Sequence, residues 1–284
     1  MGDRLGDYRI ERMSLPDVEI AIDWASREGW NPGLNDAACF HAIDPKGFFS
    51  GVIDGQTIAT GSAPIYDGQF AFIGLYIVEP AYRGKGYGLS LTQAMLAHGG
   101  DLNAGLDGVE AMAERYARLG FRTAHRSVRH GFIPTSRRNV TAEIVPLAQV
   151  PFAELADYDR RHFLAPRANF LEAWITQPHA VALGFVDGDR LQGYGVLRQC
   201  CSGYKIGPLF AEQPEIAEAL FNALCNNAIG QPVFIDMPEP NQAASKLAAK
   251  YEMKPFFACQ RMYLRGDPGL PLDAIFGITS FEAG

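Results

Sequence analysis

The 284-residue sequence lacks the usual signs of a metalloprotein, a membrane protein or a nucleic-acid-binding protein. Its five cysteines form no CxxC pair and no spacing typical of zinc, so we expect reduced thiols and no bound metal. The longest apolar runs, such as residues 71–78, are far shorter than the ~20 residues that span a bilayer. Lysine and arginine total 25 against 32 acidic residues, which gives a formal net charge of −7. We therefore expect no nucleic-acid partner, because such a partner requires a basic face.

The beginning of the sequence lacks the pattern of a secretory signal. The first residues, MGDRLGDYRIER, contain no apolar core of the kind found in a secretory signal. Together with the unpaired cysteines, this predicts a cytoplasmic protein that does not associate with membranes. Apolar residues make up 48% of the chain and charged residues 20%, which is enough apolar material for buried cores.

Several landmarks in the sequence occur twice at a constant spacing. An Asp-Gly turn between two short apolar runs stands at 54–55 and again at 187–188, a separation of 133 residues. A glycine inside an apolar strand follows each turn, Gly74 in the first case and Gly207 in the second, and these are also 133 residues apart. Repetition at a fixed offset indicates two copies of one structural unit.

Each copy is predicted to hold the same succession of elements. In the first copy a hairpin precedes an apolar strand at 69–78, and a helix then begins near residue 86. A strand, a second helix and a last strand complete the unit. This order indicates an α+β fold in which a mixed, mostly antiparallel sheet is flanked by helices. We place the boundary in the polar stretch TSRRNVT, which divides the chain into domains 1–138 and 139–284.

The stretch YRGKGYG follows the apolar strand and opens a helix. Glycines at a helix N-terminus let the main chain approach an anion, and the exposed N–H groups and helix dipole attract it. Arg83 and Lys85 add positive charge between Gly84, Gly86 and Gly88. The spacing fits neither a Walker A loop nor a complete Rossmann fingerprint. Taken alone, the stretch indicates either a phosphate-binding loop or a glycine-rich turn with exposed cations.

Two motifs together resemble the GNAT superfamily of acyl-CoA-dependent N-acyltransferases. The first is an apolar strand followed by Arg-x-x-Gly-x-Gly, here Arg83 to Gly88. The second is a tyrosine four residues before Gly-Phe, here Tyr116 before Gly120 and Phe121. The whole chain also resembles bacterial tandem GNAT proteins whose C-terminal repeat is degenerate. The resemblance therefore implies two tandem GNAT-like domains, with the coenzyme A site in the first.

The resemblance also implies roles for particular residues. Main-chain groups of the strand would pair with the pantetheine arm, and the loop amides would hold the pyrophosphate. The residues assigned to the coenzyme are Ile77, Val78, Arg83, Gly84, Lys85, Gly86, Tyr87 and Gly88. Tyr116 would be the general acid, because a phenol of pKa ~10 can hydrogen-bond or protonate a leaving thiolate whose conjugate acid has pKa ~8.5. A core tyrosine that ends a helix is the structural alternative. No metal is implied.

The general base is left open by the sequence. Members of the family often carry a glutamate on the strand before the loop, but residues 69–78 contain no acid. Protons could leave through water or through an acid or imidazole elsewhere. The candidates are Glu79, Asp67, Asp23 and His41.

The second copy has lost both motifs. At the same offset the loop is replaced by EQPEIAEALFNAL, which has no glycine and no cation, and at an offset of 132 Ala248 stands in the place of Tyr116. We therefore expect no coenzyme in the second copy. It could complete the acceptor pocket, where Asp236 or Glu239 could meet a cationic amine, or it could only pack against the first copy in place of a dimer partner.

These observations predict an acetyl-CoA-dependent N-acetyltransferase that acts by direct attack of a primary amine. The acceptor is expected to be a small molecule, and the protein a monomer or a homodimer. The rival hypothesis is a non-catalytic acyl-CoA-binding or sensing protein, which the missing strand glutamate favours. A nucleotide-binding enzyme of another kind is a third alternative.

Overall fold

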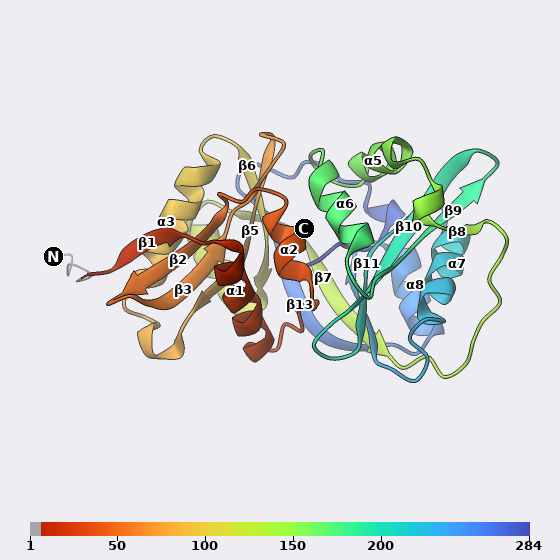
Figure 1. Cartoon of the computed structure of the whole chain (residues 1–284), viewed down its shortest axis with the longest axis horizontal. Helices are drawn as coiled ribbons and strands as arrows, with labels where there is room; N and C mark the ends of the chain where they lie inside the picture. Colours follow the sequence, from red (N-terminus) through yellow and green to blue (C-terminus); the bar gives the residue numbers. More distant parts are fainter. Residues whose placement is uncertain (1–6) are drawn as a thin grey trace.

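The structure is a computed structural model that describes residues 7–284. It has two lobes side by side, joined by a sheet that runs through both (Figure 1). The elements of the N-terminal copy are β1 (Arg9–Arg12), α1 (Leu15–Arg27), α2 (Asp36–His41), β2 (Phe48–Ile53), β3 (Gln56–Ser62), β4 (Ile65–Tyr66), β5 (Phe70–Val78), α3 (Tyr87–Gly99), β6 (Asn103–Val109), α4 (Ala113–Arg118) and β7 (Arg122–Phe132).

The C-terminal copy repeats this order. Its elements are β8 (Ile144–Pro146), α5 (Phe152–Arg160), α6 (Ala168–Thr176), β9 (Val181–Asp187), β10 (Arg190–Gln199), β11 (Tyr204–Ala211), α7 (Pro214–Cys225), β12 (Val233–Pro238), α8 (Gln242–Lys250) and β13 (Lys254–Tyr263), followed by β14 (Ile275–Gly277). The pairs β5–β6 and β11–β12 are parallel and the other strand pairs are antiparallel. The predicted fold, two α+β units with mixed, mostly antiparallel sheets, is confirmed.

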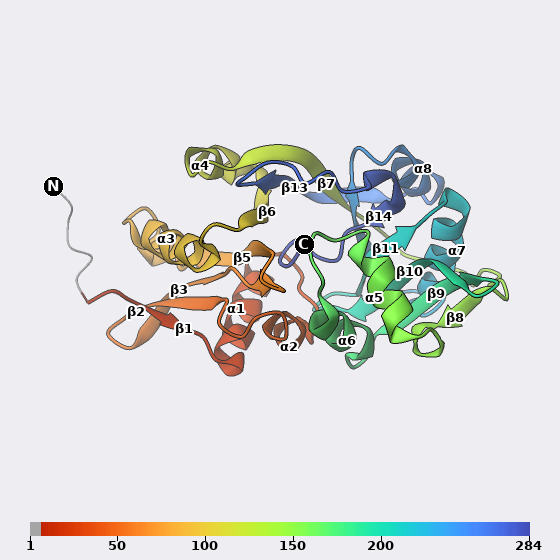
Figure 2. The same ribbon diagram turned by 90° about the horizontal axis from the view of Figure 1, so that it is seen from above.

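Strand β5 is buried because helices cover both sides of the sheet. Helices α1 and α3 both contact β5, and Figure 2 shows them on opposite sides of the sheet. Ala71 and Ile73 belong to the apolar cluster under α3, whereas Leu75 and Ile77 belong to the cluster under α1. Residues two apart normally share a face, so this change requires an extra residue in the strand. The irregularity is at Leu75, whose φ is +47°.

The last strand of each copy is exchanged with the other copy. Strand β13 lies between β6 and β7, while β7 pairs with β12, so each last strand completes the sheet of the other lobe (Figure 2). The two lobes therefore share one hydrogen-bonded ladder and do not form two independent sheets. The division of the chain into domains 1–138 and 139–284 therefore stays a prediction.

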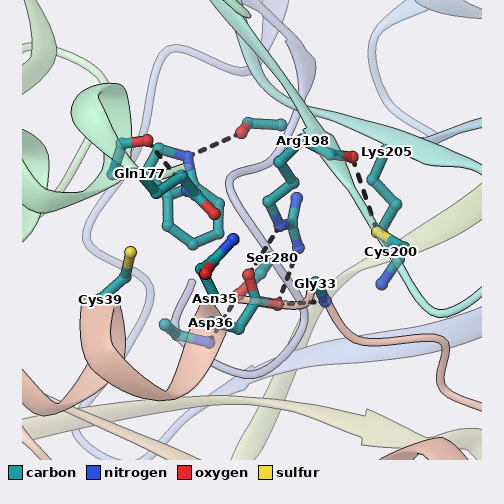
Figure 3. A network of polar contacts seen from close by, with 12 residues as sticks. Gly33, Asn35, Asp36, Cys39, Gln177, Arg198, Cys200, Lys205 and Ser280 are labelled. Atoms are coloured by element: carbon teal, nitrogen blue, oxygen red, sulfur yellow. Dashed lines mark hydrogen bonds and ion pairs between the residues drawn. The ribbon is translucent and has the colours of Figure 1, made fainter. Parts of the chain in front are cut away.

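Three buried ion pairs join the copies, and each side chain in them is at most 5% exposed. Arg261 of β13 faces Asp107 of β6, and in the equivalent position Arg129 of β7 faces Asp236 of β12. The third pair, Asp36 with Arg198, is drawn in Figure 3. Buried charges of this kind are tolerated only when they are paired, so the first two pairs favour this register of the exchanged strands and the third joins α2 to β10.

The segment after β13 runs back between the two lobes. Strand β14 pairs with β11, and residues 275–284 are all buried. The Ile278 amide donates to the Asp236 carbonyl, and the Tyr66 hydroxyl donates to the Ala283 carbonyl at 2.6 Å. This tail, residues 275–284, therefore belongs to the cores of both copies.

Candidate active site

A cavity of about 840 Å³ opens where β5 and β6 separate. The two strands pair in parallel only from Phe70–Ile73 with Asn103–Leu106. Beyond this point the irregularity at Leu75 turns β5 away, and its register with β3 also shifts. The end of β5 therefore has main-chain groups beside an open space, which is the arrangement that an extended ligand needs to pair like an added strand.

The glycine-rich loop lines one part of this cavity through Gly84, Gly86 and Gly88. Gly84 has a φ of +78° and Gly86, the residue that caps α3, has a φ of +93°, a region that side chains other than glycine rarely adopt. A Cβ at Gly88 would lie 2.1 Å from the Tyr76 hydroxyl, so a side chain would fill the space over the helix end. The 13-residue helix α3 directs its N-terminal N–H groups into this space.

Arg83 is held at the mouth of the cavity by two contacts. Its Nε donates to the Val78 carbonyl at 2.7 Å, and its Nη2 pairs with the Glu28 carboxylate at 2.5 Å. The side chain is about half exposed, at 49%. A partly exposed ion pair is weak, so an anion at the loop can compete with Glu28 for the guanidinium.

Most of the residues that the GNAT resemblance assigned to the coenzyme meet in this cavity. The lining includes Ile77, Val78, Arg83, Gly84, Gly86, Gly88 and Tyr116. Lys85 and Tyr87 are not part of it: the Lys85 ammonium lies 5.6 Å from the centre of the Tyr82 ring, and Tyr87 packs against Tyr8. The structure thus brings seven of the nine predicted residues to one cavity and leaves these two outside its lining.

Tyr116 lies on the short helix α4, half-buried beside the separated ends of β5 and β6. Burial raises the pKa of its hydroxyl above 10, and the neighbouring Tyr76 and Cys259 raise it further. The phenol is therefore protonated at neutral pH and can donate a hydrogen bond into the cavity. A Cβ at Gly108 would lie 2.6 Å from the Tyr116 ring, so the absence of a side chain on β6 makes room for it.

None of the four residues considered as bases from the sequence lines the cavity. Asp23 pairs with Arg27 on the exposed face of α1, and His41 packs near Phe48. Glu79 and Asp67 lie beyond the two ends of β5. The acids that do line the cavity are Glu28, Asp107 and Glu282. Sequence reasoning missed all three, because no local motif surrounds them.

The inner end of the cavity is aromatic and is contributed largely by the C-terminal half of the chain. Trp30, Phe257 and Phe281 line it, with Cys259 beside them. The Arg129 guanidinium lies 5.8 Å and 5.2 Å from the centres of the two phenylalanine rings, a cation–π arrangement that fixes this wall. Residues of the second copy therefore line the cavity, but Asp236 and Glu239 do not, since they pair with Arg129 and Arg126.

The equivalent space in the second copy is filled by the protein itself. Strands β11 and β12 pair over three residues, against four in β5 and β6, and β14 then pairs with β11 where the two strands separate. A Cβ at Gly207 would lie 2.4 Å from the Thr279 carbonyl oxygen, so the tail packs directly on the glycine equivalent to Gly74. Ile216 and Phe221, which replace Arg83 and Gly88, are core residues of α7. The second copy therefore has no glycine-rich loop before α7, and the end of β11 is not open to a ligand because β14 pairs with it.

Two further facts concern the part of the chain that is described. No helix in residues 7–284 is both long and apolar enough to cross a membrane. The same residues contain no group of three or more His, Cys, Asp or Glu side chains placed to hold a metal ion.

Comparison with known proteins gives matches over both copies. The model described as "Acetyltransferase (GNAT) family" matches residues 15–121, and that described as "Acetyltransferase (GNAT) domain" matches residues 155–277. A holothin acyltransferase from Pseudoalteromonas sp. (strain SANK 73390) is 29% identical over the full length of both chains. An uncharacterized N-acetyltransferase of Bacillus subtilis (strain 168) is 28% identical over 60% of this chain and 61% of its own.

Solved structures with the same fold include a putative acetyltransferase from Pyrococcus horikoshii, with a TM-score of 0.85, 21% identity and coverage of 100% of this chain and 98% of that one. A tandem GNAT protein from the clavulanic acid biosynthesis pathway has a TM-score of 0.63 at 14% identity, over 93% of this chain and 100% of its own. At these identities the likeness concerns the fold alone. The two family matches, over residues 15–121 and 155–277, show that the chain belongs to the GNAT family and carries two GNAT domains in tandem.

Proposed function

We propose that the protein is an acetyl-CoA-dependent N-acetyltransferase that transfers the acetyl group to a primary amine of a small molecule. The observation that carries this proposal is the single cavity in which the glycine-rich loop, the free end of β5 and Tyr116 meet. The relative that is named for acyl transfer to holothin supports a small-molecule acceptor. Acetyl is proposed over longer acyl groups because both matching family models are described as acetyltransferases.

Different residues of the cavity are proposed to bind different parts of acetyl-CoA. The loop amides of Gly84, Gly86 and Gly88, with the end of α3, would hold the pyrophosphate, while Arg83 would exchange Glu28 for a phosphate. Main-chain groups near Ile77 and Val78 would pair with the pantetheine arm. Acetyl-CoA is a substrate that is consumed: the amine attacks the thioester, and the sulfur leaves as a thiolate that Tyr116 stabilises by donating its proton in a hydrogen bond.

The proposal extends to the oligomeric state, the location and the partners of the protein. A single chain holds one complete cavity, so a monomer or a homodimer suffices, and a cytoplasmic location would supply the acetyl-CoA. We propose neither a nucleic-acid partner nor a membrane partner, in line with the net charge of −7. The second copy is proposed to bind no coenzyme, because β14 fills the space between β11 and β12.

The test is calorimetric titration of acetyl-CoA into the wild type and two variants of Leu89, which is 53% exposed on the first turn of α3 and lines the cavity. Leu89→Glu places a carboxylate beside the loop, and Leu89→Gln has nearly the same shape without the charge. An acid in the first helical turn does not destabilise the helix, so both variants should fold. Gly86 is a poorer position, since its φ of +93° strains any side chain.

We expect one acetyl-CoA per chain, bound at least ~10-fold more weakly by the glutamate variant than by the glutamine variant. Two sites per chain, or equal binding by both variants, would contradict the assignment of the loop. Thiol release against a panel of amines then separates an enzyme from a sensor, because a sensor binds acetyl-CoA without turnover. Titration with ATP and NAD tests the nucleotide-binding alternative, which requires them to compete with acetyl-CoA.

A further inference from the structure

Glu282 differs from the other two acids of the cavity because its carboxylate makes no hydrogen bond or ion pair with the rest of residues 7–284. Glu28 pairs with Arg83, and Asp107 accepts two hydrogen bonds from Arg261 at 2.8 and 2.6 Å. Glu282 is 4% exposed, lines the cavity, and has an Oε2 that is buried without a partner among the described residues. A buried carboxylate without a partner costs free energy, so it indicates a missing group that donates hydrogen bonds.

The main chain around Glu282 is held rigidly at the point where β5 leaves β6. The Glu282 carbonyl oxygen packs on Gly74, where a Cβ would lie only 2.0 Å away. On the next residue, the Ala283 amide donates to the Ser280 hydroxyl at 3.0 Å and the Ala283 carbonyl accepts from Tyr66. The carboxylate is thus positioned by a buried turn, and it lies on the same cavity as Tyr116. A fixed position is what a group that takes a proton from a bound substrate requires.

Ionisable groups of five strands lie close enough to Glu282 to interact with it electrostatically. They are three cations, an acid and a thiol: Arg129 of β7, Arg198 of β10, Lys205 of β11, Asp107 of β6 and Cys259 of β13. Arg129 is engaged by Asp236, and Arg198 by Asp36. Lys205 donates to the Trp30 carbonyl at 3.2 Å. Arg198 also has a buried Nη1 without a partner among the described residues, but none of the three cations forms an ion pair with Glu282, which leaves its carboxylate available to a ligand in the cavity.

The walls beside Glu282 define what kind of ligand fits. Trp30, Phe257 and Phe281 line the same end of the cavity, and the two phenylalanine rings meet edge to face at 5.9 Å. Arg129 holds both rings from behind. Fixed aromatic walls favour a flat, apolar body over a flexible polar chain, because the flat body covers the rings without leaving polar groups unpaired.

We propose that Glu282 binds the amino group of the acceptor and takes the proton that the ammonium must lose, and that the aromatic end of the cavity selects a planar, apolar primary amine. This proposal rests on the proposed acetyltransferase function. The ammonium gives one proton to Glu282, which releases it to solvent. The amine nitrogen then forms a bond to the acetyl carbon as the carbon–sulfur bond breaks. The second surplus N–H proton ends on the departing sulfur, so one proton is released per acetyl group transferred.

The test compares the wild type with Glu282→Gln, which keeps the size of the side chain and removes its basicity. Glu282→Asp serves as the conservative variant, and Glu172→Gln, on the exposed face of α6, makes the same chemical change away from the cavity. Acetyl-CoA binding by calorimetry reports whether the cavity of each variant is intact. Benzylamine is the aromatic probe, spermidine the flexible one, and benzyl alcohol the probe without an amine.

We expect Glu282→Gln to bind acetyl-CoA normally and to lose at least ~100-fold in kcat/KM for benzylamine, with the acid limb of the pH profile abolished. Glu282→Asp should recover part of the rate, and Glu172→Gln should match the wild type. In the complex with coenzyme A, benzylamine should bind at least ~10-fold more weakly to Glu282→Gln, while benzyl alcohol binds both proteins equally. The wild type should prefer benzylamine to spermidine.

Two results would overturn the proposal. One is a kcat/KM for Glu282→Gln within about threefold of the wild type, with an unchanged pH profile. The other is equal binding of benzylamine by both coenzyme complexes. Failure of the acetyltransferase function is a separate result: there the wild type releases no thiol, and the binding comparison still decides whether Glu282 recognises the amine.

Discussion

The exchange of the last strands predicts that the two copies stabilise each other through buried charges, and Arg261 tests this most directly. Its side chain is 4% exposed, that of Asp107 is 0% exposed, and the two are joined by two hydrogen bonds across β13 and β6. Arg261→Met keeps much of the apolar stem but removes the guanidinium, which also lies 5.0 Å from the centre of the Phe72 ring. The Asp107 carboxylate then lies in the core without a counter-ion.

Removing one partner of a buried ion pair costs about 3–5 kcal/mol, a large part of the stability of a typical domain. The loss should depend on pH, and its sign follows from Asp107. Burial raises the pKa of Asp107, and Arg261 is the strongest influence that lowers it, so the variant raises this pKa further. The folded variant then binds a proton more tightly than the unfolded chain, which means that acid restores stability. The destabilisation should be larger at about pH 8 than at about pH 5.

Urea unfolding followed by tryptophan fluorescence at both pH values measures this difference. The double variant Asp107→Leu/Arg261→Met is the matched control, because an apolar pair removes the unpaired charge and should recover most of the loss. A loss below about 1 kcal/mol, the same loss at both pH values, or a double variant no more stable than Arg261→Met would refute the reasoning.

Two further predictions concern His125 of β7 and Gly74 of β5. Burial and the charge of Arg261 lower the pKa of His125 to about 4, so the folded protein should lose stability as the pH falls from ~6.5 to 4. His125→Gln should remove this loss in acid unfolding curves, and an unchanged slope would contradict it. Gly74→Ala should displace the tail at Glu282 and lower both the melting temperature, by roughly 2–10 °C, and the acetylation rate. Gly99→Ala, whose Cβ would meet only ordinary contacts, should change neither.

The parts of the site that the sequence predicted are those that local chemistry dictates. An apolar run, a turn with alternating glycines and a helix start are adjacent in the chain, so the order of residues alone places the loop from Arg83 to Gly88. The same holds for Tyr116, which a short motif marks, and for the repeated order of elements. The prediction was less accurate for the side chains of this loop. The three glycines line the cavity, whereas Lys85 and Tyr87, which alternate with them, do not. A motif that acts through its main-chain groups does not indicate where its side chains point.

The exchange of β7 and β13 could not be predicted because both strands carry the same buried charge. Arg129 and Arg261 hold equivalent places in the two copies, as do Asp236 and Asp107. Pairing each strand within its own copy would also place one of these arginines opposite one of these aspartates, so the charges do not distinguish the two arrangements. The choice depends on contacts far apart in the chain, among them the path of the tail.

The closed space in the second copy and the position of Glu282 in the cavity of the first have one structural cause. Strand β14 enters the space between β11 and β12 that in the first copy forms the cavity, so a glycine-rich loop there would have nothing to hold. The same segment then continues to β5, where it packs on Gly74. Its residues Phe281 and Glu282 line the cavity of the first copy. A duplicated domain whose second site is closed by its own tail no longer has to bind a coenzyme. Its residues are then available to build the acceptor end of the remaining site, which is where a GNAT strand without its own glutamate needs a carboxylate.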